Sequence, residues 1–451
     1  MVAIAEERIL TLLDDETFIP FQAKVTSFEK KGQEGDGLFA GFGQIDGVDV
    51  AVYSQDVSYR GGSVGVVHAR KMAALIRRAR VGSLPLIGLV DSGGARLQDG
   101  IAALEGYGLV FHELIQASGS IPLISVMLGV CAGGAVYGPA LTDVVIMNEE
   151  KAQMFITGPK VLKQATGEEV DVSEYGSPLV QARLSGNVDI LEKNEERCLQ
   201  TARDFISFLK MKTTTNQRTK NELSFTFPSD TKNTYDMKLL IDQFVDEGTR
   251  RDMKDMYAPN MLTCFAQLDG QPIGVVANQP KVKAGVLDIR ASEKAARFIQ
   301  LCNAWGIPIL SFMDAVGFYP NSQEEKEGLI RKGARILYAF GRATVPKITV
   351  IVRHGYGGAF VAMNCKSLGA DAVYAFEQAD IAVMGRKGAR EILNPATFQI
   401  FCASDGLSEG LASGYIDDVL TLADAPYVVA NTLKQLSRRQ LVSDRKGNPP
   451  V

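Results

Sequence analysis

Two glycine pairs are the residues of this sequence best suited to chemistry. Gly133-Gly134 lie in GVCAGGAVYGPALTD, and Gly357-Gly358 lie in RHGYGGAFVAMNCKS. Each pair follows an apolar run that predicts a β-strand, and each precedes a predicted helix. Glycine lets the backbone approach a ligand closely, and the first N–H groups of a helix have no intrahelical acceptor. Such donors suit a developing oxyanion, where one donor is worth about 100- to 1,000-fold in rate.

An earlier strand in each half also ends in a glycine turn, DSGGAR at 91–96 and DAVGF at 314–318. Asp91 and Asp314 stand at the ends of those strands, where they are candidate bases. An aspartate in that place more often caps the turn that follows. We therefore expect both carboxylates to be turn caps.

Other catalytic chemistries find little support in the sequence. The three histidines, His68, His112 and His354, are a poor basis for a triad or a multi-histidine metal site, and we expect surface or packing roles for the first two. No Walker A, G-x-S-x-G, H-E-x-x-H or C-x-x-C motif occurs, so no metal is expected. The lack of an evident side-chain base indicates that the substrate or a cofactor handles the proton.

The paired motifs belong to an internal repeat. Asp269-Gly270 follow Asp46-Gly47 by 223 residues, and Lys294 follows Lys71 at the same distance. The two aspartates at the strand ends are also 223 residues apart, and the two glycine pairs are 224 residues apart. Further on, ASGYIDDVL at 412–420 resembles LSGNVDIL at 184–191. Anchors that keep their order and register predict two copies of one fold.

Each copy is predicted to contain the same elements in the same order. A β-rich opening with a D-G turn precedes a helix (64–80; 291–305), a buried strand (PLIGLV; PILSFM) and a second helix (103–118; 325–342). A strand then runs into the glycine pair, a helix begins after the pair, and another strand follows (DVVIM; DAVYA). Alternating strands and helices predict parallel crossover units that bind ligands at strand ends. We therefore predict an α/β fold with two domains, 1–222 and 223–451, joined through a polar segment near 212–232.

Composition narrows the class of function. The 451 residues carry a net charge of −4, which provides no electrostatic footprint for nucleic acid. Six scattered cysteines suit a reducing cytosol. The acidic start, MVAIAEERILTLLDD, is unlike a signal peptide, and no apolar run reaches about 18 residues. We therefore expect a cytoplasmic protein that does not insert into a membrane directly.

Several longer motifs resemble one family, the carboxyltransferase subunits of biotin-dependent acyl-CoA carboxylases. In the first half these are VDSGGARLQDG, CAGGAVYGPALTD and MFITGPKVLKQATGE. In the second half they are VANQP, AGVLDIRASEKAARFI, ATVPKITVIVRHGYGGAF and IAVMG, with SGYIDDVL and RKGNPP near the end. The resemblance covers nearly the whole chain. It implies two crotonase-like domains, each a ββα superhelix, and a homohexamer built as a trimer of dimers.

The resemblance also implies how the site is divided. The first domain would hold the CoA thioester, and the second would hold biotin carried on a separate protein, with each active site lying between two subunits. Gly133 and Gly134 would form the oxyanion hole for the thioester enolate, and Gly357 and Gly358 the hole for the biotin ureido oxygen. The substrate side would further include Ser92, Gly93, Gly94, Ala95, Arg96, Ala132, Ala135 and Tyr137. The biotin side would include Ala284, Gly285, Asp314, Gly317, Tyr356 and Ala359.

The implied reaction moves a carboxyl group from carboxybiotin to the α-carbon of acetyl- or propionyl-CoA, while the ureido nitrogen takes the α-proton. The implied partners are a biotin carboxyl carrier protein and a biotin carboxylase. The sequence departs from the family pattern at Val130, Val316 and Asn321, in the cationic MGRKGAR segment (384–390), and between 175 and 190. These departures concern the identity of the acyl group.

Three alternatives remain open from the sequence. A decarboxylating relative would run the same half-reaction from malonyl- or methylmalonyl-CoA to biotin. A scaffold that binds CoA without turnover would explain the unusual loops but not the two retained glycine pairs. A stand-alone crotonase such as a hydratase would need an acidic pair beside the first hole, and it would leave the second copy unexplained.

Overall fold

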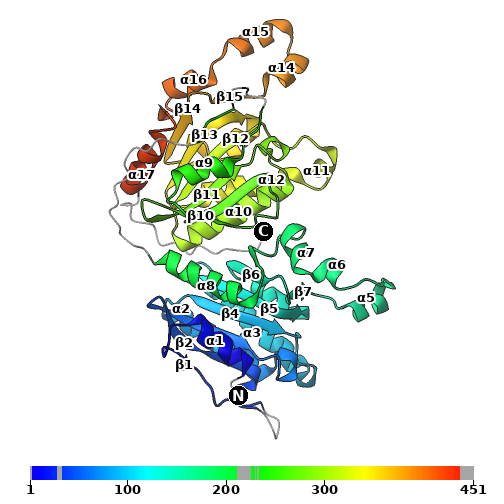
Figure 1. Ribbon diagram of the computed structural model, residues 1–451. Coiled ribbons are helices and arrows are strands. Elements are labelled where there is room, and N and C mark those ends of the chain that lie inside the picture. The colour runs from blue at the N-terminus through cyan, green and yellow to red at the C-terminus, as the bar shows by residue number, and fades with distance from the viewer. Residues whose placement is uncertain (1–2, 28–32, 211–224, 229, 231–232, 437–451) are drawn as a thin grey trace. The chain divides into compact units, whose positions relative to one another are not determined.

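The computed structural model describes residues 3–27, 33–210, 225–228, 230 and 233–436 (Figure 1). Its contacts divide the chain into two compact units, whose described residues are 3–210 and 225–436. Most of the polar segment predicted to join the domains, and the RKGNPP ending, lie outside the described residues. Each unit contains one eight-stranded sheet.

The first unit is built on a sheet in the order β1-β2-β3-β4-β5-β6-β8, with β7 also paired to β5. Its strands are β1 (Ile19–Pro20), β2 (Leu38–Ile45), β3 (Val48–Gln55), β4 (Leu86–Ser92), β5 (Leu123–Ala132), β6 (Val144–Asn148), β7 (Gln153–Phe155) and β8 (Ile190–Glu192). Its helices are α1 (Ile4–Leu12), α2 (Val66–Val81), α3 (Ile101–Ala117), α4 (Tyr137–Ala140), α5 (Pro159–Thr166), α6 (Ser173–Gly176), α7 (Pro178–Arg183) and α8 (Glu195–Leu209).

The second unit repeats that order as β9-β10-β11-β12-β13-β14-β16, with β15 paired to β13. Its strands are β9 (Arg251–Asp252), β10 (Met261–Leu268), β11 (Gln271–Asn278), β12 (Ile309–Ala315), β13 (Lys347–Tyr356), β14 (Ala372–Phe376), β15 (Asp380–Ala382) and β16 (Asp418–Leu420). Its helices are α9 (Met237–Phe244), α10 (Ile289–Trp305), α11 (Ser322–Lys326), α12 (Leu329–Arg342), α13 (Gly357–Ala362), α14 (Arg386–Ile392), α15 (Pro395–Ala403), α16 (Gly406–Ala412) and α17 (Ala425–Leu436).

The hairpin that opens each unit depends on the D-G turn seen in the sequence. Asp46 and Gly47 both have positive φ (49° and 71°), as do Asp269 and Gly270 (52° and 74°). This is the type I′ geometry that matches the twist of paired antiparallel strands. The remaining long strands run parallel, from β3 to β6 and from β11 to β14. The predicted repeat and its parallel crossovers are therefore confirmed.

Hydrophobic burial holds each sheet against its helices. The first core joins residues of α2 and α3, such as Leu75 and Leu114, to inward residues of β3–β6. The second core joins α9 and α17 to β10–β14, and Phe244 packs edge-on against Phe312 at 4.8 Å between ring centroids. Strands covered on both faces explain why the central runs, LPLIGLV and IPLISVML, are apolar throughout and lack alternation.

The helix expected after each glycine pair is much shorter than the crossover helices. In the first unit, one 3₁₀ turn (Gly133–Val136) leads into the four residues of α4. In the second unit, α13 spans six residues and ends before Asn364, whose φ is 72°. Each glycine pair thus lies within a single tight turn at the carboxyl end of a strand. The donors of that turn do not depend on a long helix dipole.

Candidate active site

A bulge before each glycine pair sets the direction in which the chain leaves the sheet. The register between β4 and β5 shifts between Val90 and Ser92, and the register between β12 and β13 shifts between Met313 and Ala315. Extra residues in β5 and β13 oppose one aspartate each, Asp91 or Asp314. Bulges of this kind re-aim a strand near functional sites. The repeat therefore places the same irregularity before both pairs.

The two glycine pairs have the same backbone form but different surroundings. Gly133 and Gly357 have φ of 64° and 54°, a left-handed conformation that disfavours other residues. A Cβ built on Gly133 or Gly134 would meet no atom within 4 Å. A Cβ on Gly357 would lie 2.9 Å from the carbonyl oxygen of Val383, and one on Gly358 would lie 3.4 Å from the ring of Phe318. The space beside the first pair is thus open, and the space beside the second is partly filled.

The loop at 92–96 lies against the strand that ends at the first pair. Ser92 pairs with Cys131, its hydroxyl donates to the carbonyl of Gly62 at 2.8 Å, and a Cβ on Gly94 would lie 2.8 Å from the carbonyl oxygen of Ala132. Gly93 donates to the carbonyl of Gly61, and Ala95 bridges to Val64. These residues are therefore brought together next to the pair as backbone packing.

Arg96 faces inward. Its side chain is 1% exposed, and its guanidinium pairs with the buried carboxylate of Asp36 at 2.6 Å and donates to the carbonyl of Ser63 at 2.9 Å. In this geometry the residue anchors the loop and offers no charge to a ligand. The motif in the sequence could not distinguish these two uses of an arginine.

The corresponding loops of the second unit pair in the same way. Leu287 donates to the carbonyl of Gly317 at 3.1 Å, and a Cβ on Gly285 would lie 2.5 Å from the carbonyl oxygen of Asp314. Ala284 has a left-handed φ of 52° in the turn before this contact. Ala359 is fully buried below the second glycine pair. These residues shape the backbone, and they leave the polar chemistry to side chains that follow.

The expectation that Asp91 and Asp314 cap turns is wrong. Oδ1 of Asp314 accepts from the backbone N–H of His354 at 3.0 Å and lies 2.7 Å from the ring Nδ1 of that residue, and its Oδ2 accepts from the Tyr235 hydroxyl at 2.8 Å. Arg353 completes the neutralisation of this carboxylate, with its Nε 3.3 Å away. The carboxylate is 1% exposed. It pins the bulged strand, because a buried charge is tolerated only when it is paired and hydrogen-bonded.

Asp91 does the same work with a different cation. It pairs with Arg8 of α1 at 3.2 Å, and Gly129 provides the room, because a Cβ there would lie 2.2 Å from the carboxylate. Burial raises the pKa of Asp91, against the opposing effect of Arg8 and of the Val130 amide. Neither aspartate is free to act as a base. The signal missed in the sequence was Arg353, which occupies in the second copy the position of Gly129 in the first.

The first unit has a cavity of about 370 Å³ beside α4. Tyr137 and Val136, which follow the glycine pair, line it together with residues of β7, α5 and α6, including Phe155, Leu162 and Tyr175. Ala135 is buried beneath this wall. The predicted residue Tyr137 is thus the substrate-side candidate whose side chain reaches the cavity.

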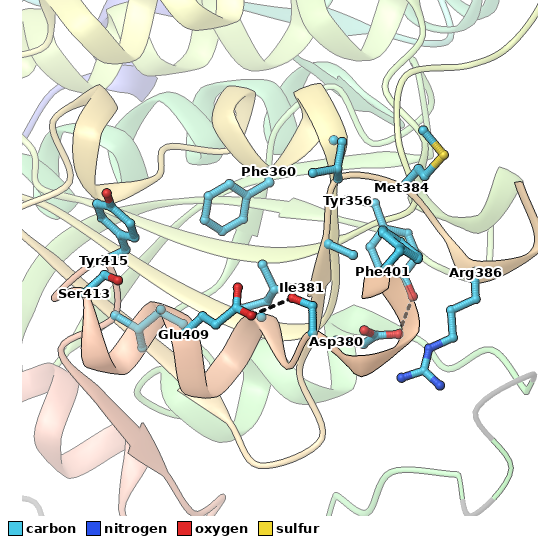
Figure 2. A pocket seen from close by; sticks show the side chains of 17 residues that line it. Tyr356, Phe360, Asp380, Ile381, Met384, Arg386, Phe401, Glu409, Ser413 and Tyr415 are labelled. Carbon is cyan, nitrogen blue, oxygen red and sulfur yellow. Dashed lines mark hydrogen bonds between the residues drawn. The ribbon is translucent and has the colours of Figure 1, made fainter. Parts of the chain in front are cut away.

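The second unit has a cavity of about 480 Å³ against its own glycine pair. Gly357 and Tyr356 line it, and Figure 2 shows Tyr356 and Asp380 joined by a hydrogen bond near Arg386, with Tyr415 and Ser413 on the opposite side. The segment that is shorter than the family pattern folds as α14–α16 and forms much of the wall. Asp380 was missed in the sequence because it precedes the recognisable IAVMG motif.

The remaining ionisable candidates lie away from both cavities. His68 is fully buried and His112 is exposed, as predicted. Within the described ranges, no three His, Cys, Asp or Glu side chains come together in a way that could hold a metal ion. No described helix combines the length and hydropathy that a membrane span requires.

Comparison with known proteins gives one consistent result. Residues 3–402 match the family model described as a carboxyl transferase domain. The methylmalonyl-CoA decarboxylase subunit alpha of Veillonella parvula is 41% identical, over 99% of this chain and 93% of its own length. A putative propionyl-CoA carboxylase beta chain of Bacillus subtilis is 45% identical, over 86% of this chain and 78% of its own length.

The fold agrees with a solved structure. Transcarboxylase 12S, described as a hexamer assembly with methylmalonyl-CoA and methylmalonic acid bound, matches with a TM-score of 0.93 and 38% identity, over 99% of this chain and 92% of that one. The prediction of two tandem crotonase-like domains is thereby confirmed.

Proposed function

The chain belongs to the carboxyl transferase family of enzymes, and from that premise we propose that it is the carboxyltransferase subunit of a biotin-dependent acyl-CoA carboxylase. It would transfer a carboxyl group to the α-carbon of a short acyl-CoA such as acetyl- or propionyl-CoA. One observation carries the proposal. The same strand, bulge and glycine turn occur twice, and each lies beside its own cavity. Two substrates of different shape can then be held by one backbone design.

The first unit is proposed to activate the thioester. The N–H groups of Gly133 and Gly134 stand at the start of a turn, where no intrahelical acceptor reaches them. Open space beside both residues admits a thioester carbonyl. Hydrogen bonds that strengthen as this oxygen gains charge favour the enolate over the ground state. Tyr137 and Phe155 would contact the acyl-CoA in the adjoining cavity.

The second unit is proposed to bind biotin, with the N–H groups of Gly357 and Gly358 directed at the ureido oxygen. The residues present fit this group, since the cavity combines an apolar wall of Phe360, Ile381 and Phe401 with polar groups at one end. Carboxybiotin, when bound, supplies the carboxyl group and a nitrogen that can take the α-proton. This assignment removes the need for a side-chain base, in keeping with the buried and paired state of Asp91 and Asp314.

The proposed assembly is a homohexamer that works with a biotin carboxyl carrier protein and a biotin carboxylase in the cytoplasm. The 12S relative, described as a hexamer, supports the first part. All six cysteines are free, which suits a reducing compartment. A scaffold without turnover is disfavoured because both glycine turns keep their geometry.

The direction of transfer separates this proposal from its nearest alternative. A subunit that moves carboxylate from methylmalonyl-CoA to biotin would use the same groups in reverse, and the relative from Veillonella parvula is named as such a decarboxylase subunit. Direction is set by the partner, because the half-reaction on this chain is reversible.

The test uses the purified protein with malonyl-CoA or methylmalonyl-CoA and follows loss of the carboxylate with and without free biotin. We expect loss that depends on biotin, with one of the two thioesters preferred. Loss without biotin would indicate an enzyme that protonates the enolate itself and would overturn the proposal. Adding the biotin carboxylase and the loaded carrier, with ATP and bicarbonate, then tests whether propionyl-CoA is carboxylated.

A further inference from the structure

The two cavities differ in the side chains that the same backbone positions present. Tyr356, at the end of β13, pairs with Ala382 of β15, and Asp380 pairs with His354. In the first unit the corresponding positions carry Ala132 and Gln153. A methyl and a neutral amide on the acyl-CoA side are therefore replaced by a phenol and a carboxylate on the biotin side.

The phenol and the carboxylate form one unit in the second cavity. The hydroxyl of Tyr356 donates to Oδ2 of Asp380 at 2.5 Å, a short charge-assisted hydrogen bond. Burial, reinforced by Asp380, raises the pKa of Tyr356, so the hydroxyl stays protonated and remains the donor. Within the described part of the chain, no other hydrogen bond to the carboxylate of Asp380 is recorded. Its Oδ1 is therefore left as an oriented acceptor at the wall of the cavity (Figure 2).

The chemistry of this acceptor fits a cyclic urea. A urea presents one carbonyl oxygen and two N–H groups, so it needs donors on one side and an acceptor on another. The turn at Gly357-Gly358 supplies the donors, and Asp380 supplies the acceptor in the same cavity. Apolar side chains around them suit the hydrocarbon and thioether parts of a bicyclic ligand. Arg386 lines the same end and offsets the negative charge there.

We propose that Asp380, oriented by Tyr356, binds the N–H of the ureido nitrogen that does not carry the carboxyl group. The choice of nitrogen follows from charge, because a carboxylate facing the carboxylated nitrogen would repel its ligand. Asp380 is then a binding residue that fixes which ureido nitrogen faces the thioester, and Tyr356 is a positioning residue that acts through it. This inference rests on the proposed function and deepens it.

The experiment compares Asp380→Gln, Tyr356→Phe and Glu377→Gln in the full-length protein. Glutamine is the residue that the first unit carries at the corresponding position, so this backbone already accommodates it. Glu377 is an exposed carboxylate three residues before Asp380 and serves as the control for loss of one negative charge. Affinity for biotin and for biotin methylated on the non-reacting ureido nitrogen is measured by ligand-observed NMR. Affinity for the acyl-CoA is measured in parallel.

We expect Asp380→Gln to weaken biotin binding by about 10- to 100-fold, the range for a hydrogen bond to a charged group. Tyr356→Phe should weaken it less, and Glu377→Gln should match the wild type. The methylated ligand should bind poorly to the wild type, while Asp380→Gln should no longer distinguish it from biotin. Acyl-CoA affinity should be the same in all four proteins.

Wild-type biotin affinity in Asp380→Gln, or an equal penalty for the methylated ligand in both proteins, would overturn the assignment. If the wild type itself bound no biotin and removed no carboxylate in a biotin-dependent way, the proposed function would fail and take this inference with it. If the wild type did both and Asp380→Gln were unchanged, only the role of Asp380 would fail.

Discussion

Replacement of Gly134 by valine tests the first oxyanion hole while leaving the fold intact. Gly134 lies within a helical turn, and a Cβ built on it would meet no atom within 4 Å. Valine and glycine differ in helix propensity by well under about 1 kcal/mol, and the difference favours valine. The free energy of unfolding should therefore change little. The added methyl groups occupy the space that a thioester must enter to bring its oxygen within about 2.7–3.1 Å of the amides.

The expected cost in rate is large by comparison. Loss of one oxyanion donor reduces kcat by about 100- to 1,000-fold, or about 2.7–4 kcal/mol of transition-state stabilisation. The assay is biotin-dependent loss of carboxylate from methylmalonyl-CoA, with a denaturant titration on the same preparation. Biotin affinity should be unchanged, because the substitution lies in the other unit. A variant with normal kcat and a normal unfolding midpoint would refute the assignment of this turn to the thioester.

Three further perturbations follow from the geometry. Gly357→Ala should lower the free energy of unfolding by about 2 kcal/mol, because its φ is 54° and its Cβ would lie 2.9 Å from the carbonyl oxygen of Val383; an unchanged midpoint in urea would contradict this. Arg96→Met should lower it by about 3–5 kcal/mol, because Asp36 would stay buried without its cation; a denaturant titration with normal stability would indicate that the pair is dispensable. Burial lowers the pKa of His68 from 6.5 to about 3, so the unfolded chain binds a proton that the folded chain does not, and stability falls as the pH drops below 6.5. Between about pH 7 and pH 5 this loss is about 2 kcal/mol, and His68→Gln should lack that part of the pH dependence in unfolding measurements.

The fold was largely predictable because its determinants are local and repeated. The D-G turns require positive φ at two successive residues, and the sequence provides them at the same place in each copy. Long apolar runs predicted buried parallel strands. The length of the helix after each glycine pair was not predictable in the same way. The chain after the pair keeps helical residues such as Ala359 and Phe360, but the next strand must return to the sheet within about ten residues, which limits the helix to a turn or two.

The backbone part of the candidate site was visible in the sequence, and its side-chain part was not. Glycine pairs mark positions where a Cβ is excluded or where a ligand approaches, and that information is local. The partners of Asp91 come from Arg8, 83 residues away, and those of Asp314 from Tyr235, 79 residues away. Contacts at such separations depend on sheet order and on the bulge register. For the same reason Arg96 could be named as a site residue from its motif, but its inward direction could not be foreseen.

The duplication itself explains how one backbone can serve two ligands. Both copies keep the elements that require exact geometry, namely the bulge, the aspartate that pins it and the glycine turn. Divergence is concentrated at the positions around that frame, where the first unit carries Gly129, Val130, Ala132 and Gln153 and the second carries Arg353, His354, Tyr356 and Asp380. The first set is small or neutral, which suits a thioester whose only strong demand is for oxyanion donors. The second set is entirely ionisable, which suits a head group that also presents N–H donors. Because these side chains are attached to a conserved backbone, they could change the ligand of one site without disturbing the donors that both half-reactions require.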